Sequence, residues 1–157
     1  VTEASTARLL LLGLAETVGS RMRRDKINAE VVSVGIKYDD FTQLSHQRVL
    51  EEPTNITTEL AQRAGQLFEE AWNGKPIRHL GVHAGRVVDQ DVSRQLKLFD
   101  DTDYEKLEKM DRTVDQIRRR FGIDSVKRAS FVQSPIDHLS GGISREKRSV
   151  DYERLGM

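Results

Sequence analysis

Cysteine is absent from this chain of 157 residues, which excludes disulfide bonds, zinc sites built on thiolates and cysteine nucleophiles. No segment approaches the run of about 20 apolar residues that a membrane helix needs. The longest leucine run covers only residues 9–12, and no cleavable signal peptide is recognisable. We therefore expect a cytoplasmic protein without a membrane partner. The first residue is valine rather than methionine, as expected of a piece of a longer protein.

Net charge is also absent, because 25 basic residues balance 25 acidic ones. Domains that bind nucleic acid are more often basic overall, so any such role here must depend on a local cluster of cations. Apolar residues make up only 37% of the sequence and charged residues 32%. This composition predicts one domain with a modest core and a heavily charged surface.

Three stretches repeat apolar residues at spacings of three and four, the period of an amphipathic helix. These helices are predicted over residues 5–25, 57–71 and 103–121. We expect Trp72 to pack at the end of the second helix, where Asn73-Gly74 stops it.

Three other stretches alternate apolar and polar residues, the period of a strand with one buried face. They cover residues 30–38, 42–50 and 77–86, and Pro53 is expected to end the second. A short extended piece is predicted over 127–132. The order of elements predicts an α+β fold. It has an antiparallel or mixed sheet of three to four strands, two helices on one face, and a C-terminal helix and tail.

The strength of these patterns divides the chain in two. Residues 1–131 are predicted to form one domain, which includes the segment 95–99 and the helix 103–121. Signals fade after Val132, and the composition of residues 132–157 is compatible with a mobile tail.

Small residues and cations occupy the non-core positions of the first and third strands, namely Ser33, Gly35 and Lys37, then His79, Gly81, His83 and Gly85. Glycine supplies no packing to a strand, so these glycines mark either bulges or the close approach of a ligand. Such a face would let phosphate oxygens reach backbone N–H groups and cations together. The candidate cations near this face are Lys37, Arg48, Arg78 and Arg86. By alternation Arg78 and Arg86 belong to the covered face, so they need a bulge or a strand end to reach the open one.

Neither a metal site nor a catalytic site is predicted. His46, His79 and His83 have no carboxylate or cysteine at metal-ligand spacing. The paired acids at 39–40 and at 89 and 91 are typical of solvated turns, and nothing gathers them around one site. We therefore expect no catalytic residue and no cofactor within this chain.

A short apolar run stands in the polar segment that follows the third strand. Gln95, Leu96, Leu98 and Phe99 give it the form Gln-Leu-x-Leu-Phe, which matches the pentapeptide that binds the bacterial sliding clamp. Apolar side chains exposed in a linker favour association, and an extended peptide can insert them into a groove. The alternative is an ordinary strand or a segment that packs on the core.

Four segments, 9–24, 31–41, 48–54 and 76–82, together resemble the little-finger domain of Y-family translesion DNA polymerases of the bacterial DNA polymerase IV type. The resemblance covers roughly residues 5–131 in consistent order. It implies a four-stranded sheet with two helices on one face, while the open face grips the phosphates of primer-template duplex DNA. Carried over by position, the DNA contacts would be Lys37, Ser45, His46, Arg48, Arg78, His79 and His83. Many relatives have arginine where the three histidines stand, and histidine is a weaker cation whose charge depends on pH.

The resemblance further implies a non-sequence-specific DNA grip and a tether to the sliding clamp, within a longer polymerase that acts in DNA damage repair. Two familiar parts are not found, namely the strand with which the family domain usually opens and the palm that binds catalytic Mg²⁺. We therefore expect this chain not to synthesise DNA by itself, although its parent would be a DNA-directed DNA polymerase. The alternative is a protein-interaction module that binds the clamp but not DNA.

Overall fold

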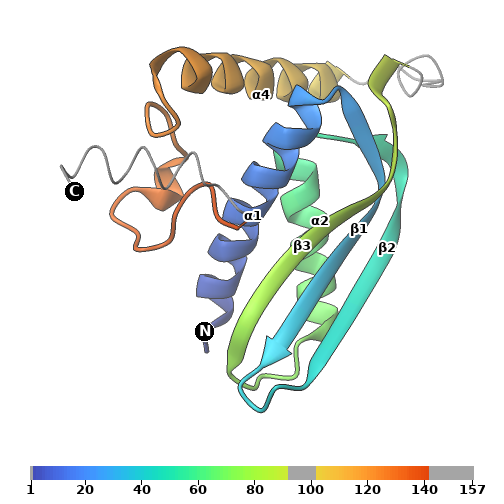
Figure 1. Cartoon of the computed structure of the whole chain (residues 1–157), viewed down its shortest axis with the longest axis vertical. Coiled ribbons are helices and arrows are strands. Elements are labelled where there is room, and N and C mark those ends of the chain that lie inside the picture. The colour runs from blue at the N-terminus through green and yellow to red at the C-terminus, as the bar shows by residue number, and fades with distance from the viewer. Residues whose placement is uncertain (1, 92–101, 142–157) are drawn as a thin grey trace.

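A computed structural model describes residues 2–91 and 102–141 of the chain (Figure 1). Its elements are, in chain order, α1 (Ala4–Arg24), β1 (Ile27–Tyr38), β2 (Gln43–Thr54), α2 (Thr57–Ala71), β3 (Ile77–Asp89), α4 (Thr102–Phe121) and the 3₁₀ helix η1 (Ala129–Phe131). The predicted order of helices and strands and the α+β class are confirmed. None of the helices in the two described ranges is long and apolar enough to cross a membrane.

The sheet has the strand order β2-β1-β3, and both pairs are antiparallel. All three strands are longer than predicted, and β2 continues through Pro53 instead of ending there. The reason is that β2 is an edge strand whose register against β1 shifts between Ala29 and Val31. Edge strands and bulges are the places where a sheet tolerates proline.

Helices α1 and α2 lie on the same face of the sheet, and the core fills the space between them and β1 (Figure 1). Side chains of β1 alternate as predicted, with Val32, Val34, Ile36 and Tyr38 at most 2% exposed. The Trp72 ring stacks on Phe68 with centroids 5.3 Å apart, and so closes the end of α2 as expected.

Two buried ionic clusters attach α4 to α1 and α2. In the first, Arg23 of α1 donates to Asp111 at 3.1 Å and to Asp115 at 2.6 Å. The Asp111 carboxylate also accepts the backbone N–H of Thr57 at 3.0 Å, which satisfies one free donor at the start of α2. Burial raises the pKa of Asp111 despite the nearby Arg23 guanidinium. α4 thus supplies the cap that the preceding residue, Ile56, does not provide.

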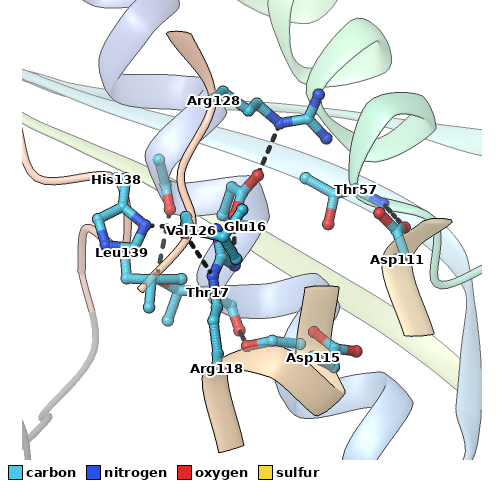
Figure 2. A network of polar contacts seen from close by, with 12 residues as sticks. Glu16, Thr17, Thr57, Asp111, Asp115, Arg118, Val126, Arg128, His138 and Leu139 are labelled. Carbon is cyan, nitrogen blue, oxygen red and sulfur yellow. Dashed lines mark hydrogen bonds and ion pairs between the residues drawn. The ribbon is translucent and has the colours of Figure 1, made fainter. Parts of the chain in front are cut away.

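The second cluster surrounds Glu16, a buried acid of α1 (Figure 2). Its carboxylate accepts from Arg118 of α4 at 2.7 Å and from Arg128 at 2.6 Å. Arg118 further donates to the Val126 carbonyl at 3.1 Å and lies 3.4 Å from Nδ1 of His138. These contacts tie α4 and the chain that follows it to one side of α1.

Residues 122–141 return along α1 after α4 ends. The predicted extended piece at 127–132 is wrong in its middle, where η1 forms instead. His138 and Ser140 of the predicted tail are buried, and the Ser140 N–H donates to the Gly13 carbonyl at 3.2 Å, so part of this tail packs on α1. Gly13 permits this contact, since a Cβ there would lie 2.7 Å from the Asp137 carbonyl oxygen. Residues 142–157 lie outside the described residues, and the division of the chain at residue 131 stays a prediction.

Candidate nucleic-acid interface

The sheet has a face that α1 and α2 do not cover, and we call it the open face. Directly opposed residues of antiparallel strands share a face, so the strand register defines it. Each row contains one residue from β2, one from β1 and one from β3. Starting at the β1–β2 turn, the four rows are Gln43–Lys37–His79, Ser45–Gly35–Gly81, Gln47–Ser33–His83 and Val49–Val31–Gly85. None of these twelve residues is acidic, whereas three are lysine or histidine. The open face therefore combines potential cations with small or neutral polar side chains.

Glycine occupies the centre of the open face without marking a bulge. The register runs unbroken through Gly35 and Gly81, and the irregularities lie elsewhere. A Cβ on Gly35 would meet nothing within 4 Å, and one on Gly81 would meet only the His83 ring at 3.8 Å. The chain's own packing thus does not demand these glycines. They leave the β1 and β3 backbones accessible to a ligand from outside.

A bulge brings Arg78 to the open face. The alternation of β3 had predicted that Arg78 could reach this face only through a bulge or a strand end. Lys37 pairs with His79 while Tyr38 pairs with Ile77, which leaves Arg78 as the extra residue. Its guanidinium carbon lies 4.7 Å from the centroid of the Phe41 ring, and the Lys37 Nζ lies 5.5 Å from the same centroid. Arg78 and Lys37 therefore gather at one end of the open face. Arg86 is exposed and has a φ of 47°, and the register of β3 against β1 does not shift there.

His46 and Arg48 do not lie on the open face, so their predicted placement is wrong. They stand opposite Val34 and Val32, whose side chains point into the core. Both bind Glu70 of α2, His46 at 2.9 Å and Arg48 at 2.7 Å. The hydrogen bond from Arg48, followed by that from His46, lowers the pKa of Glu70.

The error has a simple physical cause. Neighbouring residues of a strand point to opposite faces, so Ser45 and His46 could not share one. Because β2 is at the edge, its inward positions tolerate polar side chains, and this obscured the alternation. Residues two positions apart in a strand share a face, so Ser45 implies that Gln43 and Gln47 also lie on the open face. The sequence analysis missed these two residues. Phe41 was missed as well, since a lone aromatic in a turn gives no periodic signal.

Comparison with known proteins places the chain in a family. Residues 1–98 match the impB/mucB/samB family C-terminal domain. The chain belongs to this family. Its resemblance to the C-terminal domain of Y-family polymerases is thereby confirmed. The family match ends at residue 98, so α4 and the segment that returns along α1 lie beyond it.

Members of this family among curated proteins are similar over most of the chain. DNA polymerase IV of Acetivibrio thermocellus is 38% identical over 135 residues, which are 85% of this chain and 34% of the relative. DNA polymerase IV 2 of Bacillus subtilis is 36% identical over 126 residues, 78% of this chain and 30% of the relative. DNA polymerase IV 2 of Halalkalibacterium halodurans is 33% identical over 136 residues, with 84% and 32% covered. The chain thus spans about one third of the length of these relatives.

The structure gives no geometry for the predicted clamp-binding motif. Gln95, Leu96, Leu98 and Phe99 lie outside the described residues, between the end of β3 and the start of α4. The elements on either side of the motif are attached to the rest of the domain. After β3 the Gln90 N–H donates to the Lys26 carbonyl at 3.0 Å, and α4 forms ion pairs with Arg23 and Glu16. Within residues 2–91 and 102–141, no three His, Asp or Glu side chains are grouped to hold a metal ion.

Proposed function

We propose that this domain holds primer-template duplex DNA against its open face on behalf of a translesion DNA polymerase. One observation carries the proposal: the open face has no carboxylate among its twelve residues, which leaves its cations without an acidic neighbour on that face. Within the described residues, neither Lys37 nor Arg78 forms an ion pair with a carboxylate. Local charge can thus attract DNA even though the net charge of the chain is zero.

The proposed contacts are to phosphates rather than to bases. Lys37, Arg78, His79 and His83 supply charge, and Ser45 supplies a hydroxyl beside the accessible backbone of Gly35. Contacts of this kind position a duplex without reading its sequence, which suits a polymerase that must move along any template. His46 and Arg48 contribute less in this proposal, because both side chains already bind Glu70 on the other face.

The second proposed activity is tethering to the bacterial sliding clamp through Gln95, Leu96, Leu98 and Phe99. In the sequence the motif stands between β3 and α4, two elements that are held to the rest of the domain. Nucleotide transfer, with the Mg²⁺ that it needs, would belong to the remainder of the polymerase chain. That remainder is the third proposed partner, after DNA and the clamp. The setting of such a protein would be the bacterial cytoplasm.

Salt dependence of binding tests the DNA proposal. The full chain would be titrated against a fluorescein-labelled primer-template duplex at several salt concentrations. Each neutralised phosphate contributes about −0.9 to the slope of log K against log salt. Lys37 and Arg78 should therefore give a slope of about −2. An affinity that does not change with salt would contradict the proposal.

A parallel titration against a purified bacterial sliding clamp tests the tether. Leu98→Ala together with Phe99→Ala should abolish clamp binding and leave DNA affinity unchanged. The alternative function, a clamp-binding module without DNA affinity, is favoured by the zero net charge. It would be supported if the clamp bound while the duplex did not.

A further inference from the structure

Phe41 is an exposed aromatic residue in a strained part of the backbone. It lies in the turn between β1 and β2, its side chain is 60% exposed, and its φ is 68°. Bulky residues rarely adopt this left-handed conformation, because it brings Cβ too close to the following carbonyl oxygen. Core packing does not offset the cost, since most of the ring is in solvent. A role outside the core would explain why the turn carries phenylalanine.

Hydrogen bonds within the turn hold Phe41 in this conformation. The Asp40 carboxylate accepts from the Thr42 N–H at 3.0 Å and from the Thr42 hydroxyl at 2.5 Å. The N–H of Phe41 donates to the Tyr38 carbonyl at 2.9 Å. The N–H of Asp39 donates to the Pro76 carbonyl at 3.2 Å, which ties the turn to the residue before β3. These bonds fix the ring beside the first row of the open face.

Two cations from different strands meet over this ring. Arg78 approaches the centroid at 4.7 Å and Lys37 at 5.5 Å, both within the distance at which a cation is attracted to an aromatic ring. The bulge in β3 is what allows Arg78 to reach it. No carboxylate in the described part of the chain forms an ion pair with either cation. Both charges therefore stay available to an anion while the ring restricts where they lie.

We propose that Phe41 is a positioning residue that holds Lys37 and Arg78 ready to bind adjacent phosphates of the DNA backbone. The inference rests on the proposed function, because it assigns a role within that DNA contact. Long basic side chains lose much rotamer freedom when they bind an anion. A ring that restricts both side chains beforehand reduces this loss, which is how preorganisation raises affinity.

Variants of Phe41 in the full chain test the inference with the labelled duplex. Phe41→Leu keeps an apolar side chain but removes the ring, and it should lower DNA affinity about fivefold, because both basic side chains must then be ordered when DNA binds. Phe41→Tyr keeps the ring and should bind like the wild type. Phe41→Gly suits the positive φ, so it should melt at no lower temperature than the wild type and still lose affinity. An unchanged melting temperature with a lower DNA affinity would show that Phe41 positions the cations and is not needed for folding.

The background Lys37→Gln with Arg78→Gln distinguishes the possible failures. In that background Phe41→Leu should have no further effect, because no cations remain to be positioned. A wild-type chain that does not bind DNA would overturn the proposed function and this inference together. If DNA binds and depends on Lys37 and Arg78 but not on Phe41, only the inference is overturned. A loss of affinity from Phe41→Leu in the double-variant background would also overturn it, since Phe41 would then contact DNA directly.

Discussion

Replacing Arg118 with methionine should detach α4 and the chain that follows it from α1. Arg118 and Glu16 are 7% and 6% exposed, and their charged atoms are 2.7 Å apart. Methionine fills similar space but leaves the Glu16 carboxylate with Arg128 alone, and it leaves the Val126 carbonyl without its donor. The perturbation thus removes one partner from a buried ionic cluster rather than the whole cluster.

The cost follows from this burial. Removing one partner of a buried pair destabilises a protein by about 3–5 kcal/mol, because the remaining charge stays desolvated. That is a large part of the roughly 5–15 kcal/mol that separates folded from unfolded domains. In a domain of this size each 1 kcal/mol lowers the melting temperature by about 2–4 °C. A decrease on the order of 10 °C is therefore expected for Arg118→Met.

Thermal unfolding followed by circular dichroism measures this decrease, and hydrogen exchange locates it. Amides of α4 should lose protection in Arg118→Met, whereas amides of the central strand β1 should keep it. Arg119→Met is the matched control, since Arg119 is the exposed neighbour on the same helix. Equal melting temperatures for the two variants would show that the Arg118–Glu16 pair does not hold α4 on α1, because loss of a buried ion pair should cost more than loss of a solvated side chain.

Two further predictions concern the same packing. Burial raises the pKa of Asp111 above its ordinary value of 3.8, so the folded protein binds a proton before the unfolded chain does. Stability from this group therefore increases as the pH falls through the raised pKa toward the ordinary value of 3.8, and urea unfolding should show the wild type gaining on Asp111→Asn over that interval. Gly13→Ala should destabilise by about 1–3 kcal/mol through its clash with the Asp137 carbonyl, whereas Gly65→Ala, in open space on α2, should stabilise by about 0.5–1 kcal/mol. Chemical denaturation of both alanine variants checks these signs, and a stabilising Gly13→Ala would contradict the packing of residues 137–140.

Periodicity was sufficient to predict most of the fold. The inward alternation of β1 at Val32, Val34 and Ile36 identified the core face of the sheet, and hence the open face behind it. The same parity required a bulge for Arg78 to reach that face, and the bulge is present. These inferences succeeded because alternation in a central strand reflects burial directly.

Features that depend on contacts distant in sequence could not be predicted in this way. His46 and Arg48 were misplaced because the edge strand has a weak alternation, and their partner Glu70 lies on another element. The attachment of α4 joins Glu16 to Arg118 and Arg128, pairs separated by more than 100 residues that leave no local pattern. Phe41 lies near Lys37 and Arg78 only because the turn and the bulge in β3 bring the three side chains together, so no sequence period reveals it.

The DNA affinities of Arg78→Gln and Arg48→Gln decide which face of the sheet binds DNA, because the two arginines lie on opposite faces. With the labelled duplex at about 0.1 M salt, loss of one phosphate contact should weaken binding about eightfold and reduce the salt slope by about one. We expect this result for Arg78→Gln and a change of less than about twofold for Arg48→Gln. An equal or larger loss for Arg48→Gln would contradict the account, since DNA would then not lie on the open face.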